Sequence, residues 1–302
     1  MHAVIYLFGL KTTTIHQLRF LERALPKWFF RFFLLSSFAL KHRFFIKAQR
    51  NYPSLIEVPP LLKPDQGSLF WLFRRYYPGF LTRMATCWPD RIASSEGNTS
   101  VRFEGLDRLR EQVTQQKSSI LASLHFNDLM MLRYLLRSQG LPVAAFVYDE
   151  RPANWKAKDQ LMDELMGVQS STHVFTGREI RSAVRFLKEG KCLHIMLDSG
   201  LGEQIDLSTE LGYFSMAMAP LRFAKATQAP IFPTIMVEES PWNYVVRICE
   251  PISPTLNFDD KVQVQALGGQ LISKLLETVK LYPDQYTLNF TTRFRGFSGS
   301  SQ

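Results

Sequence analysis

From about residue 100 onward the chain alternates short apolar runs with amphipathic stretches, and this alternation constrains the fold more than any other feature. Short apolar runs are typical of buried strands, and amphipathic stretches are typical of helices packed on a sheet. The runs predict strands at 118–124, 142–148, 174–175, 192–197, 231–237, 244–249 and 285–291. The stretches predict helices at 128–138, 155–166, 180–188, 216–227 and 262–280. This order predicts a single layered α/β domain, in which helices flank a mostly parallel central sheet.

The basic residues are concentrated at the start of the chain. Residues 1–50 hold nine of the 36 Lys and Arg and one of the 27 acids, so they carry +8 of the net +9. They also hold eleven aromatic residues, including Phe32 and Phe33. Cations mixed with bulky apolar side chains are typical of amphipathic helices in a membrane interface. We therefore expect residues 1–50 to bind a membrane surface and not nucleic acid; the alternative is that these helices cover the core of the body.

Residues 1–50 contain no apolar run that is long enough to span a bilayer. Its longest apolar run, 28–40, has 13 residues and is interrupted by Arg31, whereas a span needs about 20. No charged region precedes the early run 3–10, as it would in a cleaved signal peptide. The proline-rich stretch that follows is typical of a linker. We expect a membrane-associating helical segment with its linker at 1–66, an α/β domain at 67–297 and a loose tail at 298–302.

Several kinds of site have no support in the sequence. The three cysteines, Cys87, Cys192 and Cys249, lie far apart, which fits neither a disulfide framework nor a cysteine zinc site and indicates a reducing compartment. The chain has no nucleophile elbow, Walker A motif, dinucleotide glycine pattern or HExxH motif. Four common enzyme classes therefore have no motif support.

His125 is the histidine best placed for chemistry. It follows the apolar run 118–124 directly and precedes an amphipathic helix, so it lies at the carboxyl end of a strand, where open α/β sheets build their sites. A neutral imidazole there can act as a general base if a partner fixes its tautomer. Asp128 is three residues away and is the candidate partner. The alternative is that Asp128 caps the helix.

His194 has a different predicted role. It lies within the apolar run 192–197, four residues before Asp198. Four residues along one face of a strand measure about 13 Å, which is too far for contact between the two side chains. We therefore expect a buried core histidine there.

Several blocks of sequence resemble one known family when they are taken in order. The segment Ser123-Leu-His-Phe-Asn-Asp-Leu-Met130 resembles the His-x4-acid motif of the lysophospholipid acyltransferase superfamily, closest to the lipid A late acyltransferases that transfer lauroyl and myristoyl chains. Further blocks are similar in the same order: 140–151, 177–190, 197–200, 211–233 and 282–295. The resemblance covers roughly residues 100–296.

The resemblance implies transfer of a fatty acyl chain from an acyl carrier protein or CoA thioester to a hydroxyl of a lipid or glycolipid. It implies His125 as general base, and it implies a protein peripheral on the cytoplasmic face of the cell inner membrane. It also implies that Arg178 binds substrate, by stabilising the oxyanion or a phosphate. The implied mechanism needs no metal and no bound cofactor. For Asp198, after a buried strand, a substrate-binding role and a turn-forming role are both open.

The sequence departs from the family motif at one position. The family acid would fall at residue 130, and this chain has Met130 there. Asp128 can take over that role from a shifted position, or Asp198, which can reach the same edge of the sheet, can carry the electrostatic role. A third alternative is a relative with altered or lost chemistry that binds lipid or acyl carrier. A tailoring acyltransferase for another lipid or a secondary metabolite is a further alternative.

Overall fold

The structure is a computed structural model, and it describes residues 20–29 apart from 22, 100–126, 129–147, 174–240, 243–253, 260–282, 285–286 and 294–295. The predicted helix at 155–166 lies outside these residues, as do most of the predicted linker and N-terminal segment and the predicted tail. Residues 20–29 belong to a different compact unit from the body at 103–237. Each unit is therefore described by itself.

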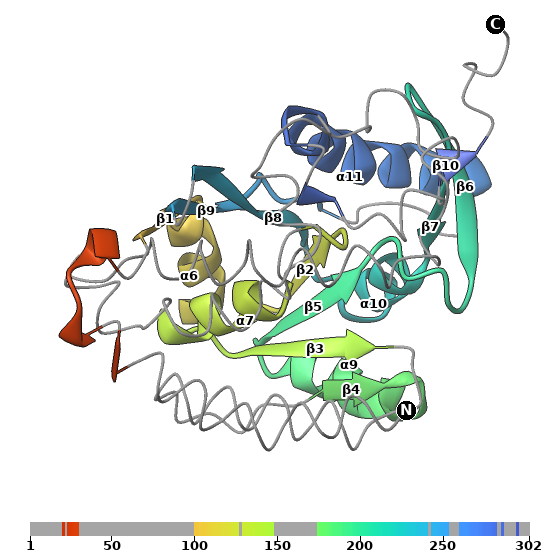
Figure 1. Cartoon of the computed structure of the whole chain (residues 1–302). Helices are drawn as coiled ribbons and strands as arrows, with labels where there is room; N and C mark the ends of the chain where they lie inside the picture. The colour runs from red at the N-terminus through yellow and green to blue at the C-terminus, as the bar shows by residue number, and fades with distance from the viewer. Residues whose placement is uncertain are drawn as a thin grey trace, which may run out of the picture. The chain divides into compact units, whose positions relative to one another are not determined.

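A seven-stranded sheet forms the centre of the body, as the alternation of runs predicted (Figure 1). Its strand order is β1-β9-β8-β2-β5-β3-β4. The pairings of β2 with β5 and β8, and of β3 with β4 and β5, are all parallel. The strands are β1 Ser100–Glu104, β2 Ser119–Ser123, β3 Val143–Val147, β4 Val174–Thr176, β5 Cys192–Met196, β8 Ile231–Ser240 and β9 Asn243–Ile248. The predicted α/β class and mostly parallel sheet are confirmed.

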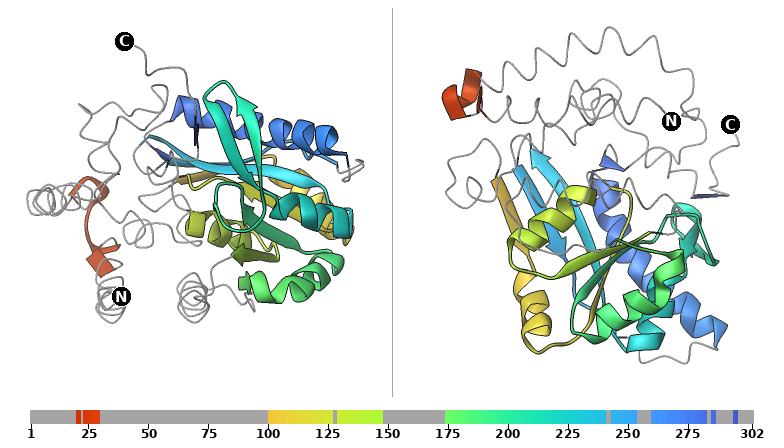
Figure 2. Two further views of the ribbon diagram at one scale, coloured as in Figure 1. Left: turned by 90° about the vertical axis from the view of Figure 1, so that its right-hand side faces the viewer. Right: turned by 90° about the horizontal axis from the view of Figure 1, so that it is seen from below.

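Helices cover both faces of this sheet (Figure 2). They are α6 Leu106–Thr114, α7 Leu129–Ser138, α9 Ile180–Lys188, α10 Ala219–Thr227 and α11 Lys261–Leu281. The β2-α7-β3 connection advances along the sheet in one direction, and the β4-α9-β5 connection returns in the other. Because parallel crossovers are right-handed, α7 and α9 lie on opposite faces. Helix α9 contacts α10 on its own face.

Side chains fix where α9 and α11 begin. Thr176 and Glu179 have the spacing of a capping box, and the Thr176 backbone N–H donates to Glu179 Oε2 at 3.1 Å. A short 3-10 turn, Gly177–Glu179, leads from β4 into α9. At α11 the Asp260 carboxylate accepts from the backbone N–H of Val262 at 2.9 Å and of Gln263 at 3.4 Å.

A second, antiparallel sheet was not predicted. It has three strands in the order β10-β7-β6: β6 Gln204–Thr209, β7 Gly212–Ala217 and β10 Phe294–Arg295. The sequence prediction also missed β1 and α6, and its helix at 216–227 was wrong at the start, because Met216 and Ala217 end β7. Strand β6 buries only Leu207 fully, so it has no apolar run that would mark it. Pro220 lies in the first turn of α10, where proline is favoured.

Strand β2 is buried at all five of its positions and has β8 on one side and β5 on the other. The residues directly after β2 therefore lie in the middle of the carboxyl edge of the sheet, between neighbouring strand ends. Among the residues that the structure describes, no helix is long and apolar enough to cross a membrane.

Candidate active site

The register of two parallel strands brings His125 and Asp198 to the same level of the sheet. Ser123 of β2 pairs with Met196 of β5, and the ladder continues with the Leu197 N–H donating to the Ser123 carbonyl at 2.8 Å. Two residues beyond the paired positions are His125 on one strand end and Asp198 on the other. Neighbouring strands are about 4.8 Å apart, so side chains at these positions can meet.

The two side chains are in direct contact. His125 Nδ1 lies 2.7 Å from Asp198 Oδ1, and the His125 backbone N–H donates to Asp198 Oδ2 at 2.9 Å. The Asp198 side chain is fully buried, whereas the His125 side chain is 25% exposed. A buried carboxylate accepts hydrogen bonds, so Nδ1 carries the ring proton and Nε2 is the basic nitrogen. This is the arrangement of a histidine prepared to take a proton.

The Asp198 carboxylate has a third hydrogen-bond donor. The Tyr286 hydroxyl donates to Asp198 Oδ2 at 2.9 Å. Tyr286 follows α11 and forms an isolated antiparallel bridge with Phe126, the residue after His125. The site therefore draws on three segments that are far apart in sequence.

His194 is buried inside the sheet and is 2% exposed, which confirms the predicted core histidine. Its Nε2 lies 2.9 Å from Ser123 Oγ, and the Ser123 hydroxyl donates to the Thr234 carbonyl at 2.6 Å. Because the Ser123 proton is used on Thr234, Nε2 of His194 must be the donor to Ser123 Oγ. His194 is thus held as the neutral Nε2–H tautomer, opposite to that of His125.

Burial lowers the pKa of His194 well below its ordinary value, and the charges of Arg133, His125 and Arg137 lower it further. Removing an imidazolium from water disfavours the charged form. The folded protein therefore favours the neutral form of His194, which fits a structural role.

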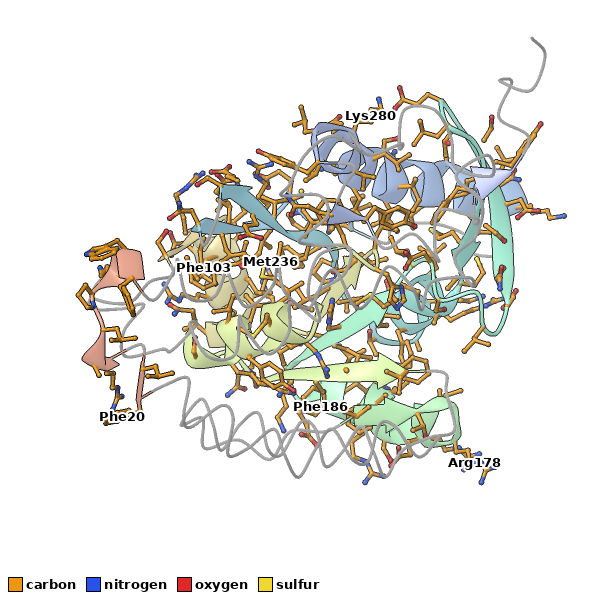
Figure 3. All side chains as sticks on the ribbon, in the orientation of Figure 1. Phe20, Phe103, Arg178, Phe186, Met236 and Lys280 are labelled. Carbon is orange, nitrogen blue, oxygen red and sulfur yellow. The ribbon has the colours of Figure 1, made fainter. Side chains whose placement is uncertain are left out.

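The other predicted site residues lie outside the described residues or away from His125. Asp128 lies outside the described residues, so its pairing with His125 stays a prediction. Met130 falls within α7. Arg178 lies in the 3-10 turn between β4 and the start of α9, is exposed, and points away from the body (Figure 3). Strand β4 is three positions from β2 in the sheet, about 14 Å at ordinary strand spacing.

The sequence predicts no role for Tyr286, although this residue lies within the block 282–295 that resembles the family. That membership was the one signal available, because no local pattern links residue 286 to residues 125 and 198. Within the described part of the chain, no group of three His, Cys, Asp or Glu side chains could hold a metal ion.

A histidine–carboxylate pair at the carboxyl edge of a mostly parallel sheet can take a proton from a substrate, and comparison with known proteins gives the reaction class. The model of the bacterial lipid A biosynthesis acyltransferase family matches residues 79–295. The chain belongs to that family, and it is an acyltransferase of lipid biosynthesis.

One solved structure that it resembles is the 1-acyl-sn-glycerophosphate (LPA) acyltransferase PlsC from Thermotoga maritima. The identity is 14% and the TM-score 0.40, over 82% of this chain and 98% of that one. A comparison with curated proteins gives no match.

Proposed function

We propose that the protein transfers a fatty acyl chain from a thioester of acyl carrier protein or CoA to a hydroxyl of a lipid or glycolipid, with His125 as general base. The observation that carries this proposal is the 2.7 Å contact between His125 Nδ1 and Asp198 Oδ1. It leaves Nε2 as the basic nitrogen on a ring that is 25% exposed. Family membership supplies the reaction class.

The proposed step balances without a cofactor. The acceptor hydroxyl gives its proton to His125 Nε2 while its oxygen attacks the thioester carbonyl carbon. The tetrahedral intermediate then collapses, the carbon–sulfur bond breaks, and the imidazolium returns the proton to the departing thiolate. Asp198 stabilises the imidazolium while it carries the extra charge, and its three hydrogen bonds keep it in place. General-base help of this kind contributes about 10²–10⁴-fold.

For the carboxylate that serves His125, we propose Asp198. It contacts both the ring and the backbone of His125, and a neighbouring strand end can supply an acid that the sequence lacks at residue 130. Asp128 is the second candidate, on the spacing in the sequence alone. Of these two, Asp198 is the residue whose contact with the ring is described.

For Arg178 we propose a phosphate-binding role. Its exposed place beyond β4 is remote from the reacting carbonyl beside His125, which disfavours an oxyanion role. It shares one exposed side of the α9 region with Arg181, Arg185 and Lys188, at the spacing of successive helical turns. A row of cations at that place suits a phosphate of a long donor or acceptor.

We propose that the protein is peripheral on the cytoplasmic face of the inner membrane and binds it through residues 1–50. The described part of that segment exposes its large rings: Phe20 is 71%, Trp28 71% and Phe29 40% exposed. Arg23 and Lys27 among them are also exposed. Exposed rings with neighbouring cations favour an interface of anionic headgroups and acyl chains.

The decisive experiment compares lipids from cells that express the wild-type chain, His125→Ala or no chain, by mass spectrometry. We expect one lipid to gain an acyl mass with the wild type and to lose it with His125→Ala, with a rate about 10²–10⁴-fold lower in a purified assay. His194→Gln is the matched control and should retain transfer, because His194 has a structural role. Full activity in His125→Ala would contradict the proposed base.

The same experiment separates the alternatives. A wild-type chain that modifies no lipid but binds acyl carrier would indicate a silent relative. Acylation of a compound outside the bulk membrane lipids would indicate a tailoring enzyme.

A further inference from the structure

The carboxylate beside His125 is unusual in its environment, because it is fully buried and has three hydrogen-bond donors. A buried charge is costly unless hydrogen bonds replace its water. The donors are unevenly shared: Oδ2 receives the His125 backbone N–H and the Tyr286 hydroxyl, whereas Oδ1 faces the His125 ring. This division fixes the plane of the carboxylate relative to the histidine ring.

Tyr286 is itself firmly placed. It is 3% exposed and packs in the main hydrophobic core. Its backbone bridges Phe126, and the Gln285 N–H beside it donates to the Tyr282 carbonyl at 3.0 Å. Because both its ring and its backbone are held, the hydroxyl reaches Asp198 from a fixed point. A donor of this kind can orient a carboxylate, whereas a flexible one only solvates it.

We infer that Tyr286 is a positioning residue for His125, acting through Asp198. Its hydroxyl occupies Oδ2 and keeps the carboxylate from rotating, so Oδ1 stays aimed at His125 Nδ1. That holds the ring in the Nδ1–H tautomer and keeps Nε2 basic and directed to the substrate. The catalytic part of this inference rests on the proposed acyl transfer; the structural part does not.

The test uses Tyr286→Phe, which removes one oxygen and leaves the ring in the core. Tyr282→Phe is the matched control, because its ring also packs on the core and its hydroxyl bonds no residue that the structure describes. Both are made in the full-length chain. Equal melting temperatures of Tyr286→Phe and the wild type would show that the fold is kept. If Tyr286→Phe is less stable, the NMR and kinetic measurements described below are made at a temperature where it is folded.

The first readout is independent of activity. Nitrogen-15 NMR of the histidine rings reports which nitrogen carries the proton, and the His125 signals are those lost in His125→Ala. We expect the wild type and Tyr282→Phe to show the Nδ1–H tautomer at His125. In Tyr286→Phe we expect a mixture of tautomers or exchange between them.

The second readout is kinetic. A hydrogen bond to a charged group corresponds to about 10–100-fold in rate, so kcat of Tyr286→Phe should fall by that factor. KM should change by less than about twofold, because Tyr286 does not contact substrate. Tyr282→Phe should match the wild type in both.

Each outcome bears on the inference. A changed tautomer together with a lower kcat supports it. A pure Nδ1–H tautomer in Tyr286→Phe overturns it, and so does an unchanged kcat. If the wild type transfers no acyl group, the proposed function fails, while the NMR result still decides whether Tyr286 orients His125.

Discussion

His125 and His194 carry their ring protons on opposite nitrogens, because their buried hydrogen-bond partners differ. His125 faces a carboxylate, so its Nδ1 donates and its Nε2 is basic. His194 faces a hydroxyl whose proton is already used, so its Nε2 donates. His125 follows strand β2, whereas His194 lies within the neighbouring strand β5. Of these two rings, only that of His125 is accessible. Position relative to the strand end therefore separates the histidine that we propose as the base from the buried one.

Asp198→Asn should almost abolish transfer by reversing the His125 tautomer. Two donors reach Oδ2, so the amide oxygen must take that place and the amide nitrogen must face His125 Nδ1. Nδ1 then has to accept, and Nε2 carries the proton and cannot act as base. We expect a loss of about 10⁴-fold in kcat, as a wrong tautomer costs in a Ser-His-Asp triad.

Asp128→Asn is the matched comparison, measured in the same purified assay. Asparagine keeps a helix cap, so we expect Asp128→Asn to change kcat by less than about tenfold. A larger loss in Asp128→Asn than in Asp198→Asn would show that the shifted acid serves the histidine.

At the scale of elements, the parallel core was predictable and the antiparallel sheet was not. Strands such as β2 are buried at every position and therefore read as apolar runs. Strand β6 has one buried residue in six and reads as loop. For the same reason, the sequence predicts the position of His125 but not its contacts. His125 stands next to an apolar run, whereas its contact with Asp198 depends on the register between β2 and β5 and its link to Tyr286 on the segment that follows α11. Neither is encoded locally.

The start of α11 offers a stability prediction. The Asp260 carboxylate accepts two backbone N–H groups of the first turn. Asp260→Ala leaves those donors without a side-chain partner, so the free energy of unfolding should fall by about 1 kcal/mol in urea denaturation. Asp260→Asn keeps an accepting oxygen and should fall by much less. Equal losses in both variants would indicate that charge and not the cap matters there.

The stability of the whole molecule should depend on pH through His194. Its pKa lies well below 6.5 in the folded protein because it is buried, so below that pH only the unfolded chain binds this proton. The contribution of this group to the free energy of unfolding should therefore be constant above about pH 6.5 and fall as the pH is lowered, by at most about 1.4 kcal/mol per pH unit.

Urea denaturation of the wild type and His194→Gln over a series of pH values checks this. Glutamine can still donate to Ser123 Oγ but does not titrate. The two curves should diverge below about pH 6.5; parallel curves would mean that His194 takes up a proton in the folded protein.

Membrane binding is a property of the whole chain and has its own test. Phe20→Ser, Trp28→Ser and Phe29→Ser together should weaken binding to phosphatidylcholine–phosphatidylglycerol vesicles by more than about tenfold, because apolar area enters the bilayer at these rings. The control replaces three exposed apolar residues of the body, Tyr213, Val262 and Leu281, by serine. Equal weakening in both variants, measured by vesicle co-sedimentation, would contradict a membrane role for residues 20–29.

The hydroxyl of Tyr286 reaches a carboxylate 88 positions earlier in the chain, and this has a consequence during synthesis on the ribosome. A nascent chain that has emerged only as far as α11 already contains His125 and Asp198, but it lacks the Tyr286 hydroxyl. On the proposed role of Tyr286, the base is oriented only after residue 286 has left the ribosome and packed against Phe126. On the same proposed role, proteolytic loss of the segment after α11 should lower kcat at least as much as Tyr286→Phe does.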